Sequence, residues 1–194
     1  MNDKIRFGKE YDRKAITELL AKGFPEQWKA LSKKKKKVME IIEGGIHPEN
    51  FVLCEEDGDI IAVLGFNDGK SFPVTVDKRA LWRNYFILAP IFGYFMEKEF
   101  AMSHLANTDI LHLSFFTVDS DVRGRGKGRE FFQKALELLD KEYYVFDVVK
   151  ESLLPFYESM GFRIIKRKKI PFSFIYHYKY RYIMVGTGKV KTRS

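Results

Sequence analysis

The stretch VDSDVRGRGKGREFF, residues 118–132, places three glycines at alternate positions, with arginine or lysine between them, directly before an apolar pattern of helical spacing. Glycine permits positive φ and has no Cβ to keep a ligand away from the backbone. The first N–H groups of a helix have no acceptor within the helix, and the helix dipole favours a negative charge at that end. The stretch is therefore compatible with a bound phosphate, with a nucleic acid, or with a flexible basic turn, and the segments around it decide between these three.

The segments on either side of this loop predict a mixed sheet. Residues 110–118 (ILHLSFFTV) are β-prone and lead into the loop, and residues 129–142 have the apolar spacing of a helix. Asp57-Gly58 lies between two further β-prone runs and suits the positive φ angles of a tight hairpin. In chain order the predicted elements are helices within 10–43 broken near 23–25, a hairpin over 51–67, a strand over 110–118, a helix over 129–142, a strand over 143–149, a short helix over 152–160, and closing strands over 162–169 and 174–185. This order predicts a single α/β (α+β) domain over residues 1–194.

Composition limits the partners and the compartment. The 194 residues are 45% hydrophobic and carry a formal net charge of +8, so we expect one full-sized core and an attraction for anionic partners. Cys54 is the single cysteine, lies in an apolar run and cannot form an internal disulfide, which favours a reducing cytoplasm. No signal-peptide pattern and no run of about 18 uncharged apolar residues occurs, so we predict neither export nor a membrane span.

Residues 67–109 separate the hairpin from the next strand and exceed what such a connection needs. Their middle, ALWRNYFILAPIFGYF at 80–95, is strongly apolar. Three interpretations are open: a helix packed in the core or over the hairpin, a mobile lid over an acceptor pocket, or a contact with a membrane surface or a second subunit. A homodimer is one form of the last interpretation.

The phosphate motifs of other families fit this loop poorly. A P-loop needs Ser or Thr after its Gly-Lys, but Gly128 follows Lys127, and the Gly-x-Gly-x-x-Gly dinucleotide pattern is absent. The spacing that fits is Arg-x-x-Gly-x-Gly, from Arg123 to Gly128. Downstream, LLPFYESMGF places Tyr157 four residues before Gly161-Phe162. Together these segments resemble the acetyl-CoA-binding core of the GNAT N-acetyltransferase superfamily, over residues 110–165.

The resemblance implies a GNAT fold, a mixed central sheet flanked by helices, with 67–109 as an apolar insertion between the third and fourth strands. It also implies acetyl-CoA as co-substrate, its pyrophosphate held by the loop. Two positions depart from the family pattern, where Lys150 and Leu153 replace the frequent Asn and Ala, and Lys150 could instead reach a phosphate. The expected cofactor-binding residues are Val118, Arg123, Gly124, Arg125, Gly126, Lys127, Gly128, Arg129 and Lys150.

Acyl transfer to an amine needs a base for the nitrogen, donors for an oxyanion and an acid for the departing thiolate. Tyr157 is the candidate acid, since a phenol stays protonated at neutral pH, and the resemblance implies the same role. The resemblance also implies that the Val118 N–H serves as oxyanion donor where its strand separates from the next one. His112 is the candidate base, because strict alternation would turn its side chain to the same face as Ser114, Phe116 and Val118. We expect no metal, since no Cys, His and Asp cluster has ligand spacing.

The predicted function is N-acyltransfer from coenzyme A to an amine, on a small molecule or a peptide. Two alternatives from other classes stay open. A nucleic-acid-binding module could use the RGRGKGR loop and the tyrosine and lysine alternation of IYHYKYRY, although no known nucleic-acid-binding signature occurs. A non-catalytic acyl-CoA sensor would keep the loop without turnover.

Overall fold

A computed structural model describes residues 3–29, 32, 34–67, 69, 71–75, 77–85, 110–170 and 178–188, and all structural statements concern these residues. Most of the apolar stretch 80–95 and the start of the predicted strand 174–185 therefore lie outside the described part.

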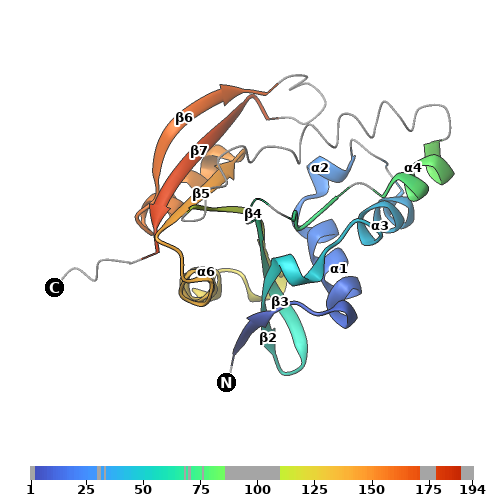
Figure 1. The fold of residues 1–194 in the computed structure, drawn as a ribbon, viewed down its shortest axis with the longest axis horizontal. Helices are drawn as coiled ribbons and strands as arrows, with labels where there is room; N and C mark the ends of the chain where they lie inside the picture. Colours follow the sequence, from blue (N-terminus) through green and yellow to red (C-terminus); the bar gives the residue numbers. More distant parts are fainter. Residues whose placement is uncertain are drawn as a thin grey trace.

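A seven-stranded mixed sheet forms the centre of the molecule, in the order β1-β2-β3-β4-β5-β7-β6 (Figure 1). Every pair is antiparallel except β4 and β5, which run parallel. The strands are β1 (Lys4–Phe7), β2 (Phe51–Glu56), β3 (Asp59–Asn67), β4 (Ile110–Val118), β5 (Tyr143–Val148), β6 (Arg163–Lys169) and β7 (Tyr180–Thr187). The predicted mixed sheet is confirmed, and β1 is a strand that the sequence patterns did not predict.

Helices cover both faces of this sheet and bury two separate apolar clusters. On one face Phe132 and Ala135 of α6 are fully buried, with Tyr157 of α7 beside them. On the other face Ile16 of α1 and Ile41 of α3 are fully buried. The helices are α1 (Arg13–Gly23), α2 (Pro25–Lys29), α3 (Lys35–Glu43), α4 (Lys78–Tyr85), α6 (Lys127–Leu139) and α7 (Leu154–Glu158), with short 3-10 turns at Glu10–Asp12, Pro48–Asn50, Ser120–Val122 and Glu151–Leu153.

The tight turn and the helix break were predicted correctly. Asp57 and Gly58 have φ of 53° and 92°, the left-handed pair that a two-residue hairpin requires. The first helical region ends at Gly23, and α2 begins at Pro25, where the fixed φ of proline suits the start of a helix. No helix among the described residues is long and apolar enough to cross a membrane.

A bulge in β4 changes which residues share a face. Ser114 and Thr117 are three positions apart on β4, while their partners Gly65 and Val63 are only two positions apart on β3. Phe115 takes up the extra residue with a φ of 51°, a conformation that is rare for a bulky side chain. One extra residue shifts the alternation by one position, so side chains before and after Phe115 no longer follow one pattern.

Strands β4 and β5 are paired along only part of their length. Their register covers Ile110 to Leu113 against Tyr143 to Phe146. Beyond Leu113, β4 continues through the bulge to Val118, and β3 is the only strand among the described residues that pairs with it there. The sheet is therefore continuous at the start of β4 and open between β4 and β5 at the end of β4.

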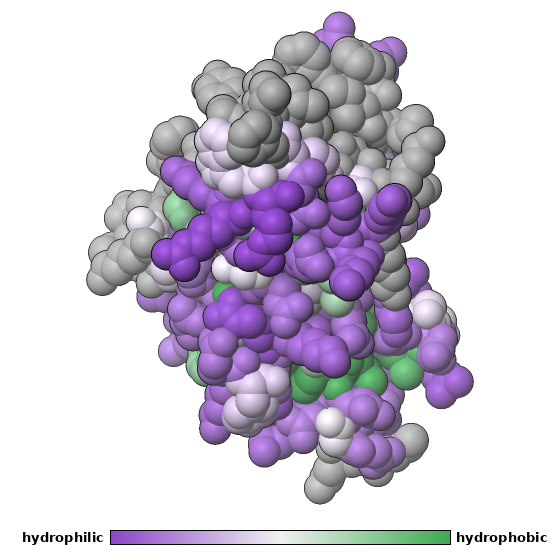
Figure 2. Space-filling view, turned by 90° about the vertical axis from the view of Figure 1, so that its right-hand side faces the viewer, coloured by the Kyte–Doolittle hydropathy of each residue, from purple (hydrophilic) through white to green (hydrophobic). Residues whose placement is uncertain are grey.

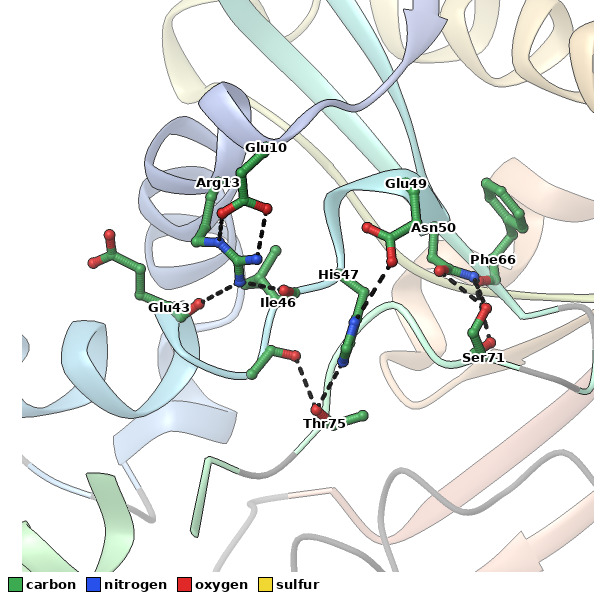
Figure 3. A network of polar contacts seen from close by, with 11 residues as sticks. Glu10, Arg13, Glu43, Ile46, His47, Glu49, Asn50, Phe66, Ser71 and Thr75 are labelled. Carbon is green, nitrogen blue, oxygen red and sulfur yellow. Dashed lines mark hydrogen bonds and ion pairs between the residues drawn. The ribbon is translucent and has the colours of Figure 1, made fainter. Parts of the chain in front are cut away.

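A polar network ties the chain after β3 to the first helices (Figure 3). Arg13 of α1 donates to the backbone carbonyls of Glu43 and Ile46, which fixes the end of α3. Farther along, Val74, Ala80 and Leu81 are buried in the cluster under α1 and α3. The remaining contacts join His47 to Thr75 (3.0 Å), Asn50 to the Ser71 hydroxyl (2.8 Å) and Arg13 to Glu10 (2.7 Å). The described start of the predicted insertion thus contributes residues to the core, and the three interpretations of the stretch 80–95 concern mostly residues outside the described part.

Five consecutive lysines, residues 33–37, lead into α3 and form its first turn. Lys34 and Lys36 are exposed, and the face that carries α3 and α4 is largely hydrophilic (Figure 2). These lysines need no ligand to explain them, because charged side chains on the outer face of an amphipathic helix are solvated.

Candidate active site

The glycine loop leaves five consecutive N–H groups without an acceptor. Arg123 N–H donates to the Ser120 carbonyl, and the next backbone donation is from Arg129 to Gly126. Between them, the N–H groups of residues 124–128 have no acceptor among the described residues. Unpaired backbone N–H groups near a surface are the donors that phosphate oxygens use.

Positive φ at two glycines shapes this loop. Gly124 and Gly126 have φ of 77° and 78°, and a Cβ built on either would meet no atom within 4 Å. Their glycines are therefore needed for the backbone conformation, while the space beside them is open. Gly126 forms the N-cap of α6, so the last three free N–H groups belong to the cap and the first turn of a thirteen-residue helix.

The cationic side chains around the loop have different surroundings. The Arg123 Nε donates to the Val118 carbonyl at 2.9 Å, and Arg129 donates to the Ser159 hydroxyl at 2.8 Å. Lys127 contacts the carboxylates of Asp3 and Glu56, which raise its pKa above the ordinary lysine value. The charge of the Lys127 ammonium is thus already neutralised by two carboxylates of the protein. Its backbone N–H is still one of the five that have no acceptor. Arg125 and Lys150 contact no acid among the described side chains, which leaves their charge available to an anion.

The backbone of Val118 is turned towards the opening between β4 and β5. Asp119 N–H donates to the Ile61 carbonyl at 2.8 Å, and Val118 lies opposite Ala62. In an antiparallel ladder the position next to a hydrogen-bonded pair points its N–H and C=O away from that partner strand. The contact of the Val118 carbonyl with Arg123 agrees with this direction. The Val118 N–H is therefore directed away from β3, on the side where β5 has ended its pairing.

Tyr157 lies in an aromatic cluster beside Val118. The side chain of Tyr157 is 2% exposed, and its ring contacts the ring of Phe116 edge to face, with 6.4 Å between the centroids. Phe116 in turn lies 3.8 Å from the position that a Cβ on Gly128 would occupy. Val118 lies 3.4 Å from that same Cβ position. Burial raises the pKa of Tyr157 well above the ordinary phenol value, so the hydroxyl is protonated at neutral pH. The loop, Val118 and Tyr157 are thus neighbours on the α6 side of the sheet.

His112 does not share a face with Val118, and that prediction is wrong. Leu111 and Leu113 pack in the α6 cluster before the bulge, and Phe116 and Val118 pack there after it. His112 alternates with the two leucines, so its side chain lies on the opposite face, together with Ser114. Strict alternation failed because Phe115 inserts one residue between the two halves of the strand.

On that face His112 meets Asp147, a residue that sequence reasoning missed. The His112 Nε2 lies 3.4 Å from an oxygen of Asp147, and the two side chains are only 11% and 15% exposed. His112 pairs with Val145, two residues before Asp147 on the same face of β5. The pair therefore lies where β4 and β5 begin to separate. The N–H of Val118 is directed towards the same opening between the two strands. An isolated acidic residue in the apolar run YYVFDVV was the available signal.

Two further observations concern the thiol of Cys54 and the arrangement of potential metal ligands. Cys54 is a buried thiol, and burial raises its pKa to about 11, so it is not a reactive nucleophile. Within the described residues no group of three or more His, Cys, Asp or Glu side chains is placed to hold a metal ion.

Comparisons with known proteins agree with this geometry. Solved structures with the same fold include polyamine N-acetyltransferase of Drosophila melanogaster (TM-score 0.61, 13% identity, 96% of this chain and 100% of that chain). They also include a ribosomal-protein-alanine N-acetyltransferase of Escherichia coli (TM-score 0.58, 13% identity, 100% and 98%). N-acetylglutamate synthase of Neisseria gonorrhoeae, solved with coenzyme A and N-acetyl-glutamate, is a third (TM-score 0.56, 13% identity, 97% and 36%).

At this level of identity the structural likeness establishes the fold alone. A search of curated proteins gives no significant match. The sequence profile of the Acetyltransferase (GNAT) domain, however, matches residues 70–183, more than half of the chain. The chain therefore belongs to the GNAT acetyltransferase family.

Proposed function

We propose that this protein transfers an acetyl group from acetyl-CoA to an amine acceptor by direct attack of the nitrogen. The observation that carries the proposal is the row of five unpaired N–H groups at residues 124–128, next to the opening between β4 and β5. Acetyl-CoA supplies an activated acyl group as a thioester, together with a pyrophosphate that such a row can bind.

The loop binds the pyrophosphate through its backbone, and side-chain charge adds to this. Arg125 and Lys150 are exposed on the same side as the loop and α7, and neither has an acidic partner among the described residues. Arg123 holds the loop against Val118 through its contact with the Val118 carbonyl. Binding of the phosphates thereby places the thioester towards the strand opening.

Three groups of the protein meet the chemical demands of the transfer. The Val118 N–H donates to the carbonyl oxygen of the thioester as negative charge develops on it. Tyr157 gives its proton to the sulfur as the carbon–sulfur bond breaks and the carbon–nitrogen bond forms. His112 takes the proton that the nitrogen loses, and the Asp147 carboxylate, 3.4 Å from Nε2 without a hydrogen bond to it, stabilises the imidazolium that forms.

The acceptor approaches from the α1 and α3 side, where His112 and Asp147 lie. Residues 67–109 begin on this side, since α4 contacts α3, and we propose that their remaining part shapes the acceptor site. An amine on a small molecule and an amine on a peptide both fit this description. We also propose that residues 1–194 act as a single domain with 110–165 as its acyl-CoA-binding core.

The proposal is tested by calorimetry with acetyl-CoA and by a screen of amines that reads free thiol release. Gly126→Ala should weaken acetyl-CoA binding at least about tenfold, because the added Cβ enters the open space that a phosphate would occupy. Gly58→Ala is the matched control: its φ is 92° and its Cβ also meets no atom within 4 Å, but it lies outside the loop, in the turn between β2 and β3.

Equal binding by the two variants would contradict the loop assignment. Binding without turnover of any amine would instead favour the acyl-CoA sensor. Tight nucleic-acid binding with no affinity for acetyl-CoA would favour the nucleic-acid module.

A further inference from the structure

Positive charge is concentrated in the last part of the chain. Residues 159–194 contain ten of the 34 Lys and Arg residues and no Asp or Glu. The first 158 residues carry the other 24 cations and all 26 acids, so their formal charge is −2. The last 36 residues have a formal charge of +10, which exceeds the net charge of +8 of the whole chain. Such asymmetry indicates a local contact with an anionic partner, because a charge needed for solubility could be spread over the whole surface.

The fold places five of these ten cations on β6, at one edge of the sheet. β6 is the last strand of the sheet order, with β7 on its inner side and no strand paired to its outer side in the described part of the chain (Figure 1). All seven of its residues are exposed. Five of the seven are cations, and none of them has an ion-pair partner among the described side chains; they are Arg163, Lys166, Arg167, Lys168 and Lys169.

These cations lie on both faces of the strand. Lys168 lies opposite Arg181 of β7, and Lys166 lies opposite Ile183. Arg167 and Lys169 pair with Tyr182 and Tyr180, on the α7 side, and the Arg167 guanidinium lies 3.5 Å from the centroid of the Tyr180 ring.

The edge also carries apolar side chains. Ile164 and Ile165 are 39% and 52% exposed at the bulge of β6. Lysines alone would agree with protection of an edge against self-association, but protection does not explain two exposed isoleucines beside them. A seven-residue strand offers about 23 Å of backbone donors and acceptors, a length suited to an extended segment of similar size.

We propose that the β6 edge is a docking surface for an acidic, extended peptide segment of a partner protein. The segment adds an eighth strand by backbone hydrogen bonds to β6. Its carboxylates meet Lys166 and Lys168 on one face of β6, and its alternating apolar side chains cover Ile164 on the other face. A nucleic acid would use the charge but neither the backbone edge nor the isoleucines, so the peptide accounts for more of the surface. This surface goes beyond acetyl transfer and does not depend on it.

The test is fluorescence anisotropy with a labelled eight-residue peptide of alternating Glu and Val, titrated with the full chain in the absence of acetyl-CoA. Three probes accompany it: the Gln and Val analogue, the Glu and Val peptide N-methylated at alternate amides, and an eight-nucleotide single strand. The variant is Lys166→Gln with Lys168→Gln. Its control is Lys14→Gln with Lys36→Gln, which removes the same charge from exposed positions on α1 and α3.

The acidic peptide should bind the wild type and the control variant alike, and the β6 variant about tenfold more weakly. The Gln analogue and the N-methylated peptide should also bind at least about tenfold more weakly than the acidic peptide. Equal binding of the N-methylated peptide, or tighter binding of the oligonucleotide, would show a general polyanion site and overturn the proposal. Absence of peptide binding, or equal loss in the control variant, would overturn it as well.

Discussion

The candidate site depends on a few single residues, in the glycine loop and on either side of Phe115 in β4. Gly124 and Gly126 have the positive φ that motivated the loop assignment. The position of His112 was not predictable, because nothing in ILHLSFFTV marks Phe115 as an extra residue. Bulges arise from pairing between strands, and strand alternation alone contains no information about the partner.

At Tyr157, removal of the hydroxyl separates packing from proton donation. Tyr157→Phe should keep acetyl-CoA affinity and fold stability nearly unchanged, since the ring still fills the same aromatic cluster. Turnover should fall about tenfold to a thousandfold. Because burial keeps the phenol protonated, the loss should be similar at every pH, and steady-state rates from pH 6 to 9 measure this. Full activity of the variant would exclude the acid role.

At His112, the predicted effect depends on pH. An alkyl amine has a pKa near 10.4, so the reactive form becomes scarcer as the pH falls. His112→Ala should therefore reduce kcat/KM most at the lower end of the pH range. Asp147→Asn should cause a smaller loss with the same pH trend, because the imidazole is kept but the nearby carboxylate that stabilises its charged form is removed. If His112→Ala leaves both rate and pH profile unchanged, the histidine is structural.

At the scale of elements, the hairpin, β4, α6 and β5 follow their sequence patterns closely, since each has a clear apolar period and a turn or cap residue at its end. β1 was missed because four residues with two charges, KIRF, have no such period. It is held by a long-range contact: Arg6 donates to Glu55 of β2 at 2.8 Å and to Asp12 at 2.7 Å. Contacts between distant residues cannot be read from a local pattern.

The Arg6 and Asp12 pair predicts a pH dependence of stability. Hydrogen bonds from Arg6 lower the pKa of Asp12 below its ordinary value. A carboxyl with a lowered pKa in the folded state contributes stability that is present above its unfolded pKa, about 3.9, and is lost as the pH falls through the lower folded value. Asp12→Asn should reduce the free energy of unfolding by about 1–3 kcal/mol at pH 7.

Urea unfolding of both proteins between pH 2 and pH 7 measures this difference. It should shrink at the acidic end, where the wild-type carboxyl is protonated. Lys14→Gln, at an exposed position in the first turn of α1, serves as the control and should change stability by less than about 0.5 kcal/mol. A gap between wild type and Asp12→Asn that is constant with pH would contradict the pairing.

At the scale of the whole molecule, one continuous sheet divides the site between two faces. The pyrophosphate loop, Val118 and Tyr157 lie with α6 and α7, and His112 and Asp147 lie with α1 and α3. The two sets meet at the opening between β4 and β5. The sequence predicts the first set through a continuous motif, whereas the second depends on how β5 is paired and is visible only in the fold.

This division predicts separable functions. Replacing residues 86–109 with a Gly-Ser linker of equal length spares Val74, Ala80 and Leu81, which are core residues. The variant should bind acetyl-CoA with unchanged affinity and lose turnover of amines, if the replaced segment shapes the acceptor site. Calorimetry and thiol release measure the two properties. Unchanged turnover would exclude an acceptor role for that segment.

The backbone amides of the glycine loop are the groups on which binding of acetyl-CoA depends most, and they can be observed individually. Acetyl-CoA titrated into ¹⁵N-labelled protein should shift the amide resonances of residues 124–128 and of Val118 more than any others, with one common saturation curve. Amides of Ile41 and Ile42, which are buried in α3 on the opposite face of the sheet, should stay unchanged. Saturable binding with the largest shifts elsewhere, or no shift at these six amides at millimolar acetyl-CoA, would contradict the central claim.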